Sequence, residues 1–204
     1  MPDKYSNYDE LSQNERQDVD YTIFHRGTDS QLAVMAIHGG GIEPGTLDIA
    51  DAIAGCDHTF YCFKALKKSW SNLLHITSNG FDEPLGIQVA QKALTVISIH
   101  GARFKTETIH IGGRNQYLGQ KIMHALIDAG FNAKISKVPG LKGISPGNIC
   151  NRCKSREGIQ LEISRGLREK MFDDLKFRNL RKRTVCFYKF VNTMKEVLST
   201  FTQA

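Results

Sequence analysis

Two short runs of aliphatic and β-branched residues limit the folds open to this chain. LAVMAI at residues 32–37 and TVISI at 95–99 each end at a histidine, His38 and His100 respectively. Runs of this length without regular polar alternation are typical of strands buried on both faces of a sheet. Segments with helical spacing lie between and after them. We therefore expect a central sheet with helices on both faces.

The rest of the chain alternates between strand and helix patterns. Further strands are predicted at 58–63, 108–111, 131–138 and 158–164, and helices at 47–54, 85–93, 117–129 and 184–201. This alternation favours an α/β fold with a mixed or mostly parallel central sheet. A chain of 204 residues is long enough for one sizeable core, so we expect a single domain over 1–204. Its polar first 20 residues are expected to pack loosely.

The N-terminal sequence and the cysteine count indicate where the protein is made and the state of its thiols. The polar N-terminus lacks the apolar stretch of a signal peptide, and no later segment is apolar enough to span a bilayer, which predicts cytosolic synthesis. Five cysteines, an odd number, argue for reduced thiols. Cys150 and Cys153 have zinc-knuckle or dithiol spacing, but no second such pair exists, so buried thiols are favoured over either alternative.

A net charge of +6 favours an anionic partner, which could be a nucleic acid, an acidic polymer or a membrane surface. The densest basic run precedes the last helix and consists of Lys176, Arg178, Arg181, Lys182 and Arg183. Such a run is either a solvated face or a nucleic-acid contact, and charge alone does not choose between them.

Three potential zinc ligands lie near the predicted strand ends. In IHGGGIEPG, residues 37–45, three glycines separate His38 from Glu43, and their conformational freedom allows Glu43 to return towards His38. Because ligands bind beyond the carboxyl ends of strands in such sheets, His100 can join them. Two histidines and one glutamate form the ligand set of hydrolytic zinc sites. The residues equally allow a strand-end histidine, a plain turn and a Glu43 that complements a helix dipole.

Glu162 is the candidate catalytic carboxylate. In GIQLEIS, residues 158–164, it lies on the face opposite the isoleucines and leucine. On a central strand this carboxylate would be buried, which is costly unless it is paired, neutralised or functional. Beside a zinc-bound water it could act as general base and then as general acid. On an edge strand it would only face water.

Asn151, Arg152 and His75 are candidate substrate-binding residues. An arginine beside an asparagine can hold a carboxylate through a bidentate pair and an amide hydrogen bond. His75 lies in LHITSNGFDEP at 74–84, where a following carboxylate could orient it. The same stretch is equally consistent with a loop in which Asp82 caps the next helix.

Five stretches carry a resemblance to a known family: HGGGIEPGT at 38–46, LHITSNGFDEP at 74–84, SIHG at 98–101, IGG at 111–113 and NICNRCKSREGIQLEIS at 148–164. On these stretches the chain resembles the phage-type poly-γ-glutamate hydrolases, small zinc enzymes that cut the γ-linked glutamate polymer of bacterial capsules. The resemblance extends to the metallocarboxypeptidase-like architecture, in which a zinc His, a zinc Glu, a later zinc His and a catalytic Glu follow in this order.

The resemblance implies one zinc ion held by His38, Glu43 and His100, with a zinc-bound water as nucleophile and Glu162 as general base and acid. Asn151 and Arg152 would correspond to the Asn-Arg pair that grips a substrate carboxylate in carboxypeptidase-like enzymes, although they follow the last zinc histidine. An acidic polymer substrate would give the positive charge a role in steering. A phage-related hydrolase made without a signal peptide can reach such a polymer after cell lysis.

Two other functions stay open on the sequence. A zinc amidase could act on a different acidic amide, such as a cell-wall γ-glutamyl amide or an acylated amino acid. A nucleic-acid-binding protein could use the basic run at 176–183, but this would leave the histidines and glutamates without a purpose, so nucleic acid is the less favoured partner. We expect no membrane partner, and the sequence does not indicate an oligomeric state.

Overall fold

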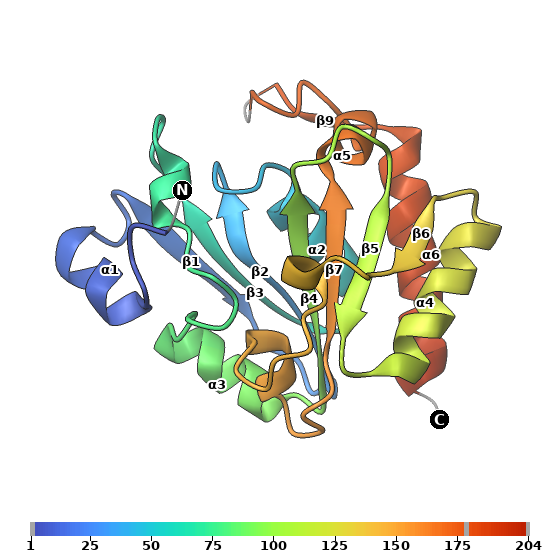
Figure 1. Ribbon diagram of the computed structural model, residues 1–204. Coiled ribbons are helices and arrows are strands. Elements are labelled where there is room, and N and C mark those ends of the chain that lie inside the picture. Colours follow the sequence, from blue (N-terminus) through green and yellow to red (C-terminus); the bar gives the residue numbers. More distant parts are fainter. Residues whose placement is uncertain (1–2, 178–179, 203–204) are drawn as a thin grey trace.

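Figure 1 shows a computed structural model of the protein, which describes residues 3–177 and 180–202. Within this part of the chain, seven strands form one sheet in the order β1-β3-β2-β4-β7-β5-β6. They are β1 (Tyr21–Arg26), β2 (Leu32–Gly40), β3 (Thr59–Ala65), β4 (Thr95–Ala102), β5 (Ile109–Gly113), β6 (Ala133–Ile135) and β7 (Ile159–Ser164). A separate short ribbon pairs β8 (Phe172–Asp173) with β9 (Lys182–Arg183).

The sheet is mixed and mostly parallel, which confirms the predicted fold class. β3, β2, β4 and β7 run parallel to their neighbours in this group, whereas β1 is antiparallel to β3 and β5 is antiparallel to β7. β6 completes the edge parallel to β5. In Figure 1 the arrowheads of β4 and β7 point to the same edge, and that of β5 points the opposite way. The carboxyl ends of β2, β4 and β7 therefore meet at one edge of the sheet.

Helices cover both faces of this sheet. One face carries α2 (Thr46–Ala54), α4 (Gln116–Asp128), α5 (Arg165–Met171) and α6 (Val185–Thr202). The other carries α1 (Tyr8–Asn14), α3 (Pro84–Lys92) and the short 3-10 helices η1 (Ser71–Leu74) and η3 (Ile149–Arg152), and a further 3-10 turn, η2, spans Pro139–Leu141. Alternate residues of β2 enter the two apolar clusters, which is why residues 32–37 are all apolar.

A β-bulge interrupts this alternation near the end of β2. Between Ala36 and Gly39, β2 advances by three residues while β3 advances by two. Strict alternation would place His38 on the face of Ala36, under α2. Because the extra residue shifts the side-chain period, His38 instead follows Ile37 onto the α3 face, where it meets His100. The bulge thus re-aims a side chain at the edge where the strands end.

The polar N-terminal segment is packed rather than loose. Tyr5 and Leu11 are buried in the cluster on the α3 face. The buried Glu15 carboxylate accepts a hydrogen bond from the Tyr5 hydroxyl at 2.6 Å and pairs with Lys4 and Lys67. Scattered apolar residues and one well-partnered carboxylate are therefore enough to dock this segment.

The basic run does not form a single exposed surface. Arg181 contacts the Asp48 carboxylate at 2.6 Å and lies over the Phe172 ring. Lys182 and Arg183 are exposed on β9, and Arg178 lies outside the described residues. Part of the run thus serves packing between α2 and the β8–β9 ribbon. Among the described helices, none has the length and apolar character needed to cross a membrane.

Candidate active site

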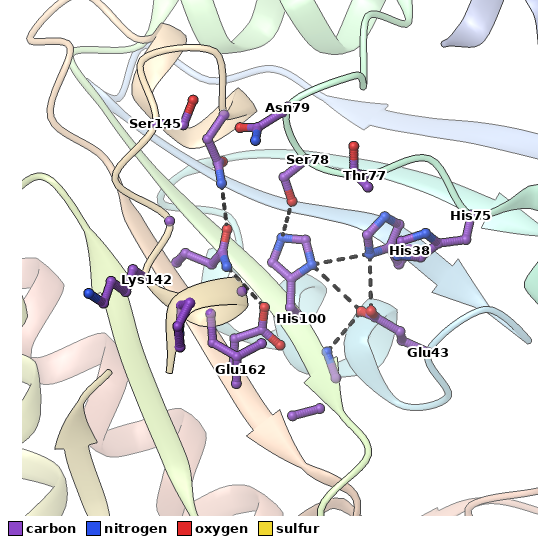
Figure 2. A pocket seen from close by; sticks show the side chains of 18 of the residues that line it. His38, Glu43, His75, Thr77, Ser78, Asn79, His100, Lys142, Ser145 and Glu162 are labelled. Carbon is purple, nitrogen blue, oxygen red and sulfur yellow. Dashed lines mark hydrogen bonds and ion pairs between the residues drawn. The ribbon is translucent and has the colours of Figure 1, made fainter. Parts of the chain in front are cut away.

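A cavity of about 520 Å³ opens at the edge where β2, β4 and β7 end. Its walls are formed by residues 77–79, 101–104 and 139–145. The titratable groups predicted for the site line it together: His38, Glu43, His75, His100 and Glu162. Figure 2 shows these side chains converging from separate segments of the chain. The expected juxtaposition of the two strand-end histidines therefore occurs.

Three ligand atoms meet at the centre of the cavity. The backbone amide of Glu43 donates to the carbonyl of His38 at 2.9 Å, which closes the glycine turn and brings Oε1 of Glu43 to 3.1 Å from Nδ1 of His38. Nδ1 of His100 lies 3.1 Å from Nδ1 of His38 and 3.7 Å from Oε2 of Glu43. In a tetrahedral zinc site, ligand atoms stand about 3.3 Å apart. The spacing of these three groups fits a zinc-sized cation.

Hydrogen bonds on the far side of each ring orient the two histidines. Nε2 of His38 lies 2.8 Å from the carbonyl oxygen of Ile76, which can only accept, so this nitrogen carries a proton. Burial opposes a charge on His38, but Glu43 outweighs it and raises the pKa of this ring, so Nδ1 offers a lone pair to a metal once it gives up its own proton. Nε2 of His100 lies 2.8 Å from the hydroxyl of Ser98, which can accept in the same way. Metal-bound histidines generally donate their outer nitrogen to such partners. Both Nδ1 atoms are therefore arranged as ligands.

His75 is an alternative to His100 as the third metal ligand. Its ring lies against that of His38 with centroids 4.0 Å apart, and one ligand atom each of His38, Glu43 and His75 lie within 4.8 Å of one another. Nδ1 of His75 contacts the Asp3 carboxylate at 2.7 Å. Distance alone would allow His75 to replace His100 as a ligand. His100 is 2% exposed and its Nδ1 lies 3.1 Å from that of His38, so the geometry offers both His75 and His100 as the third ligand.

The surroundings of Glu43 stabilise the ionised form of its carboxylate. Burial opposes ionisation of Glu43, but His38, His100 and the Gly101 amide, which donates to Oε2 at 2.8 Å, together lower the pKa of Glu43 to about 2. Burial also lowers the pKa of His100 to about 3, which keeps this ring neutral. A neutral imidazole and an ionised carboxylate are the forms that bind a metal.

Glu162 lies beside this group on the same face of the sheet. In the strand register it faces His100 on β4 and His110 on β5. It is 7% exposed, and burial, followed by the charge of Glu43, raises the pKa of Glu162 to about 8. A carboxyl group that titrates near neutrality at a cavity wall is suited to acid and base catalysis.

Asn151 and Arg152 do not line the cavity, contrary to their predicted role as a substrate clamp. The Asn151 amide donates to the carbonyls of Gly143 and Ser145 at 2.7 and 2.8 Å. Arg152 donates to the carbonyl of Gly147 at 2.9 Å and also to that of Asn79. These hydrogen bonds to backbone carbonyls show that the pair holds the loop that forms the wall of the cavity.

The carboxylate beside His75 also differs from expectation. Glu83, rather than Asp82, caps α3 by accepting from the amides of Leu85 and Gly86. Asp82 accepts from the backbone amide of Tyr8, and the group that contacts His75 is Asp3. The N-terminal segment therefore reaches the site, a contact across 72 positions that no local pattern indicates.

The two cysteines of the CNRC stretch have structural surroundings. Cys150 and Cys153 are both buried, and burial raises the pKa of the Cys150 thiol well above its usual range. Neither forms a disulfide, and within the described residues no metal-ligating group gathers around them. Of the three alternatives, buried thiols fit this environment.

Arg168 is a buried residue of the site that the sequence does not reveal. Its guanidinium group donates to the carbonyls of Pro44, Ala102 and Ile163 at 2.6, 3.0 and 3.1 Å. These carbonyls adjoin the segments that carry Glu43, His100 and Glu162. Arg168 thus ties together the ends of three segments that form the site, and nothing in its sequence neighbourhood predicts this.

A family model for poly-gamma-glutamate hydrolases matches residues 5–193. The chain belongs to the poly-γ-glutamate hydrolase family. It is accordingly a hydrolase, and the match extends further in both directions than the five stretches in the sequence suggested. Among curated proteins, YndL of Bacillus subtilis strain 168 is 36% identical over 197 residues, covering 94% of this chain and 76% of YndL.

Solved structures of related proteins agree with this assignment. A bacteriophage poly-gamma-glutamate hydrolase superposes with a TM-score of 0.94 at 28% identity, covering 98% of both chains. A zinc-free structure of YndL gives 0.92 at 35% identity and covers 98% of this chain and 99% of the other. An N-formylglutamate amidohydrolase from Ralstonia eutropha JMP134 shares the fold alone, at 10% identity and a TM-score of 0.56 over 90% of this chain and 98% of the other.

Proposed function

We propose that this member of the family hydrolyses γ-glutamyl amide bonds of poly-γ-glutamate with one zinc ion held by His38, Glu43 and His100. The convergence of the two Nδ1 atoms and the Glu43 carboxylate beside a buried Glu162 carries the proposal. Zinc would supply a Lewis acid that polarises the scissile carbonyl and acidifies a water molecule. The zinc-free structure of YndL supports the choice of metal.

Glu162 would move the proton during hydrolysis. Its carboxylate would accept a proton from the attacking water and then deliver it to the leaving amide nitrogen. Burial raises the pKa of Glu162 to about 8, and a nearby cation would lower this pKa towards about 7. The same carboxyl group could then accept the proton from water and donate it to the leaving nitrogen. Glu43, held by the Gly101 amide, would remain ionised as a ligand.

Arg103 and Lys142 are the cations that would receive the substrate. Both line the cavity, in two different walls, and could pair with the free α-carboxylates that every residue of the polymer carries. They take the place that we first expected for Asn151 and Arg152. A net charge of +6 would further favour encounter with a polyanion at low salt. Action on capsular polymer after cell lysis belongs to this proposal.

The test is cleavage of high-molecular-weight poly-γ-glutamate, followed by sizing of the products. Zinc-loaded protein should shorten the polymer, and a chelator should stop it. Glu162→Gln should keep its zinc and lose cleavage by about 100-fold or more. Glu157→Gln is a matched control, because Glu157 is exposed outside the cavity. Full activity of Glu162→Gln would remove this residue from the mechanism.

Failure of zinc-loaded wild type to cleave the polymer would overturn the substrate assignment. A separate measurement tests the cations: Arg103→Gln and Lys142→Gln should each raise KM for the polymer by about tenfold, because each removes a charge-assisted contact. An unchanged KM in both variants would show that the α-carboxylates bind elsewhere.

A further inference from the structure

A buried chain of hydrogen bonds leads from the backbone to the Glu162 carboxyl group. The amide of Cys150 donates to Oδ1 of Asn148 at 3.1 Å, and Nδ2 of Asn148 donates to Oε1 of Gln160 at 2.7 Å. Nε2 of Gln160 then donates to Oε1 of Glu162 at 2.9 Å. In Figure 2 the dashed line that ends at Glu162 marks the last bond of this chain. Its three side chains are all buried.

The direction of every bond in the chain follows from its first member. An isolated side-chain amide can be turned over, because its oxygen and nitrogen have similar shapes. A backbone amide can only donate, so Asn148 must present its oxygen to Cys150 and its NH₂ group to Gln160. Gln160 must then accept through its oxygen, which leaves its own NH₂ group for Glu162. The backbone of η3 therefore determines that Glu162 receives a donor.

The hydrogen bond from Gln160 occupies one carboxyl oxygen of Glu162 and leaves the other available for proton transfer. Among the described residues, the hydrogen bond from Gln160 is at Oε1 and none reaches Oε2. Residues 160 and 162 are two apart on β7, so their side chains share the face that lines the cavity. A fixed Oε1 restricts rotation of the carboxyl group, and Oε2 becomes the oxygen that exchanges protons with water or substrate.

We propose that Asn148 and Gln160 are positioning residues that hold the Glu162 carboxyl group in the orientation needed for hydrolysis. Neither needs to touch the reacting atoms, since Asn148 acts only through Gln160. The inference rests on the proposed role of Glu162 in polymer cleavage. The alternative is that Asn148 has a purely structural role as the cap of η3, and the experiment must distinguish this role from positioning of Glu162.

Asn148→Asp is the variant that separates the two roles. An aspartate still caps η3, because its carboxylate accepts from Cys150, but it cannot donate to Gln160. The Gln160 amide must then turn over to donate to residue 148 and would present its oxygen to Glu162. We expect kcat for polymer cleavage to fall by about tenfold or more, with KM and zinc content nearly unchanged. Asn115→Asp, at the cap of α4, is the matched control and should leave kcat unchanged.

Gln160→Met, of similar size but without an amide, should lower kcat to a similar extent. In the double variant, Asn148→Asp should cause no further loss, because the group through which it acts is absent. Additive losses, or a change confined to KM, would overturn the proposal. Crystal structures give a test that does not depend on the substrate: the Glu162 carboxyl should adopt one orientation in the wild type and several in Gln160→Met. An unchanged carboxyl orientation in that variant would refute the positioning role even if the polymer proves not to be the substrate.

Discussion

Replacing Glu162 with glutamine should stabilise the zinc-free protein increasingly as the pH rises. Glutamine resembles the protonated carboxyl group, keeps an oxygen for the donor of Gln160 and carries no charge at any pH. The wild-type carboxyl group is buried near the Glu43 charge and therefore favours its protonated form in the folded state. In the unfolded chain it is solvated and ionises in its usual range.

The sign and size follow from proton linkage. Between the usual pKa of 4.5 and the folded value of about 8, the folded protein binds more protons at Glu162 than the unfolded chain does. Wild-type stability contributed by this group is therefore complete below pH 4.5 and is lost as the pH rises towards 8. The upper bound is about 5 kcal/mol, and relaxation of the site should leave a few kcal/mol.

Urea unfolding in the presence of a chelator, at intervals from about pH 5 to 9, measures this effect. The free energy of unfolding of Glu162→Gln minus that of the wild type should be small at the acidic end and should grow until about pH 8. Glu157→Gln, an exposed control, should show no such trend. Adding zinc should flatten the dependence, because a cation favours the ionised carboxylate. A difference independent of pH would refute the claim that burial of Glu162 controls its ionisation.

Three further predictions concern the ligands and the frame of the site. His100→Ala should weaken zinc binding by about 100-fold or more, whereas His75→Ala should weaken it by less than about tenfold; the reverse ranking in a chelator titration would assign the third ligand to His75. Gly40→Ala should lower the free energy of unfolding by about 2 kcal/mol or more, because φ is +71° and the new Cβ would lie 2.3 Å from a backbone oxygen. Gly140→Ala, where no atom lies within 4 Å of the new Cβ, should be nearly neutral in the same denaturation assay. Arg168→Met should cost about 3 kcal/mol or more, because three carbonyls lose a buried donor, and a small loss would show that water replaces it.

Much of the scaffold was predictable because its central strands are buried on both faces. Such strands are apolar along most of their length, so β2 and β4 stand out as mainly apolar runs. The edge strand β1 was missed because an edge strand needs neither continuous apolar residues nor strict alternation, and its pattern of burial is irregular. The predicted end of β2 fell short of Gly40 because its last residues pair with β3 without being apolar.

The polar groups of the site were predictable only in part. His38, His100 and Glu162 were predictable as site residues. Burying a polar side chain at a strand end or within a covered strand costs free energy, so such a residue is a good candidate for a functional role. The contacts of Asn151 and Arg152 were not predictable. Nearby backbone carbonyls compete with a substrate for the donors of these two side chains, and the outcome depends on the conformation of the loop.

By itself, the sequence determined the class of fold and the residue types at the strand ends, since burial constrains composition strand by strand. Only the tertiary structure decided which of those groups meet. Alternation along β2 would direct His38 under α2, away from His100, and one extra residue at the bulge turns it to the other face. A register shift of one residue reverses the face of a side chain but leaves the apolar pattern almost unchanged. Strand order and that bulge together bring Nδ1 of His38 to 3.1 Å from that of His100, a residue 62 positions further along the chain.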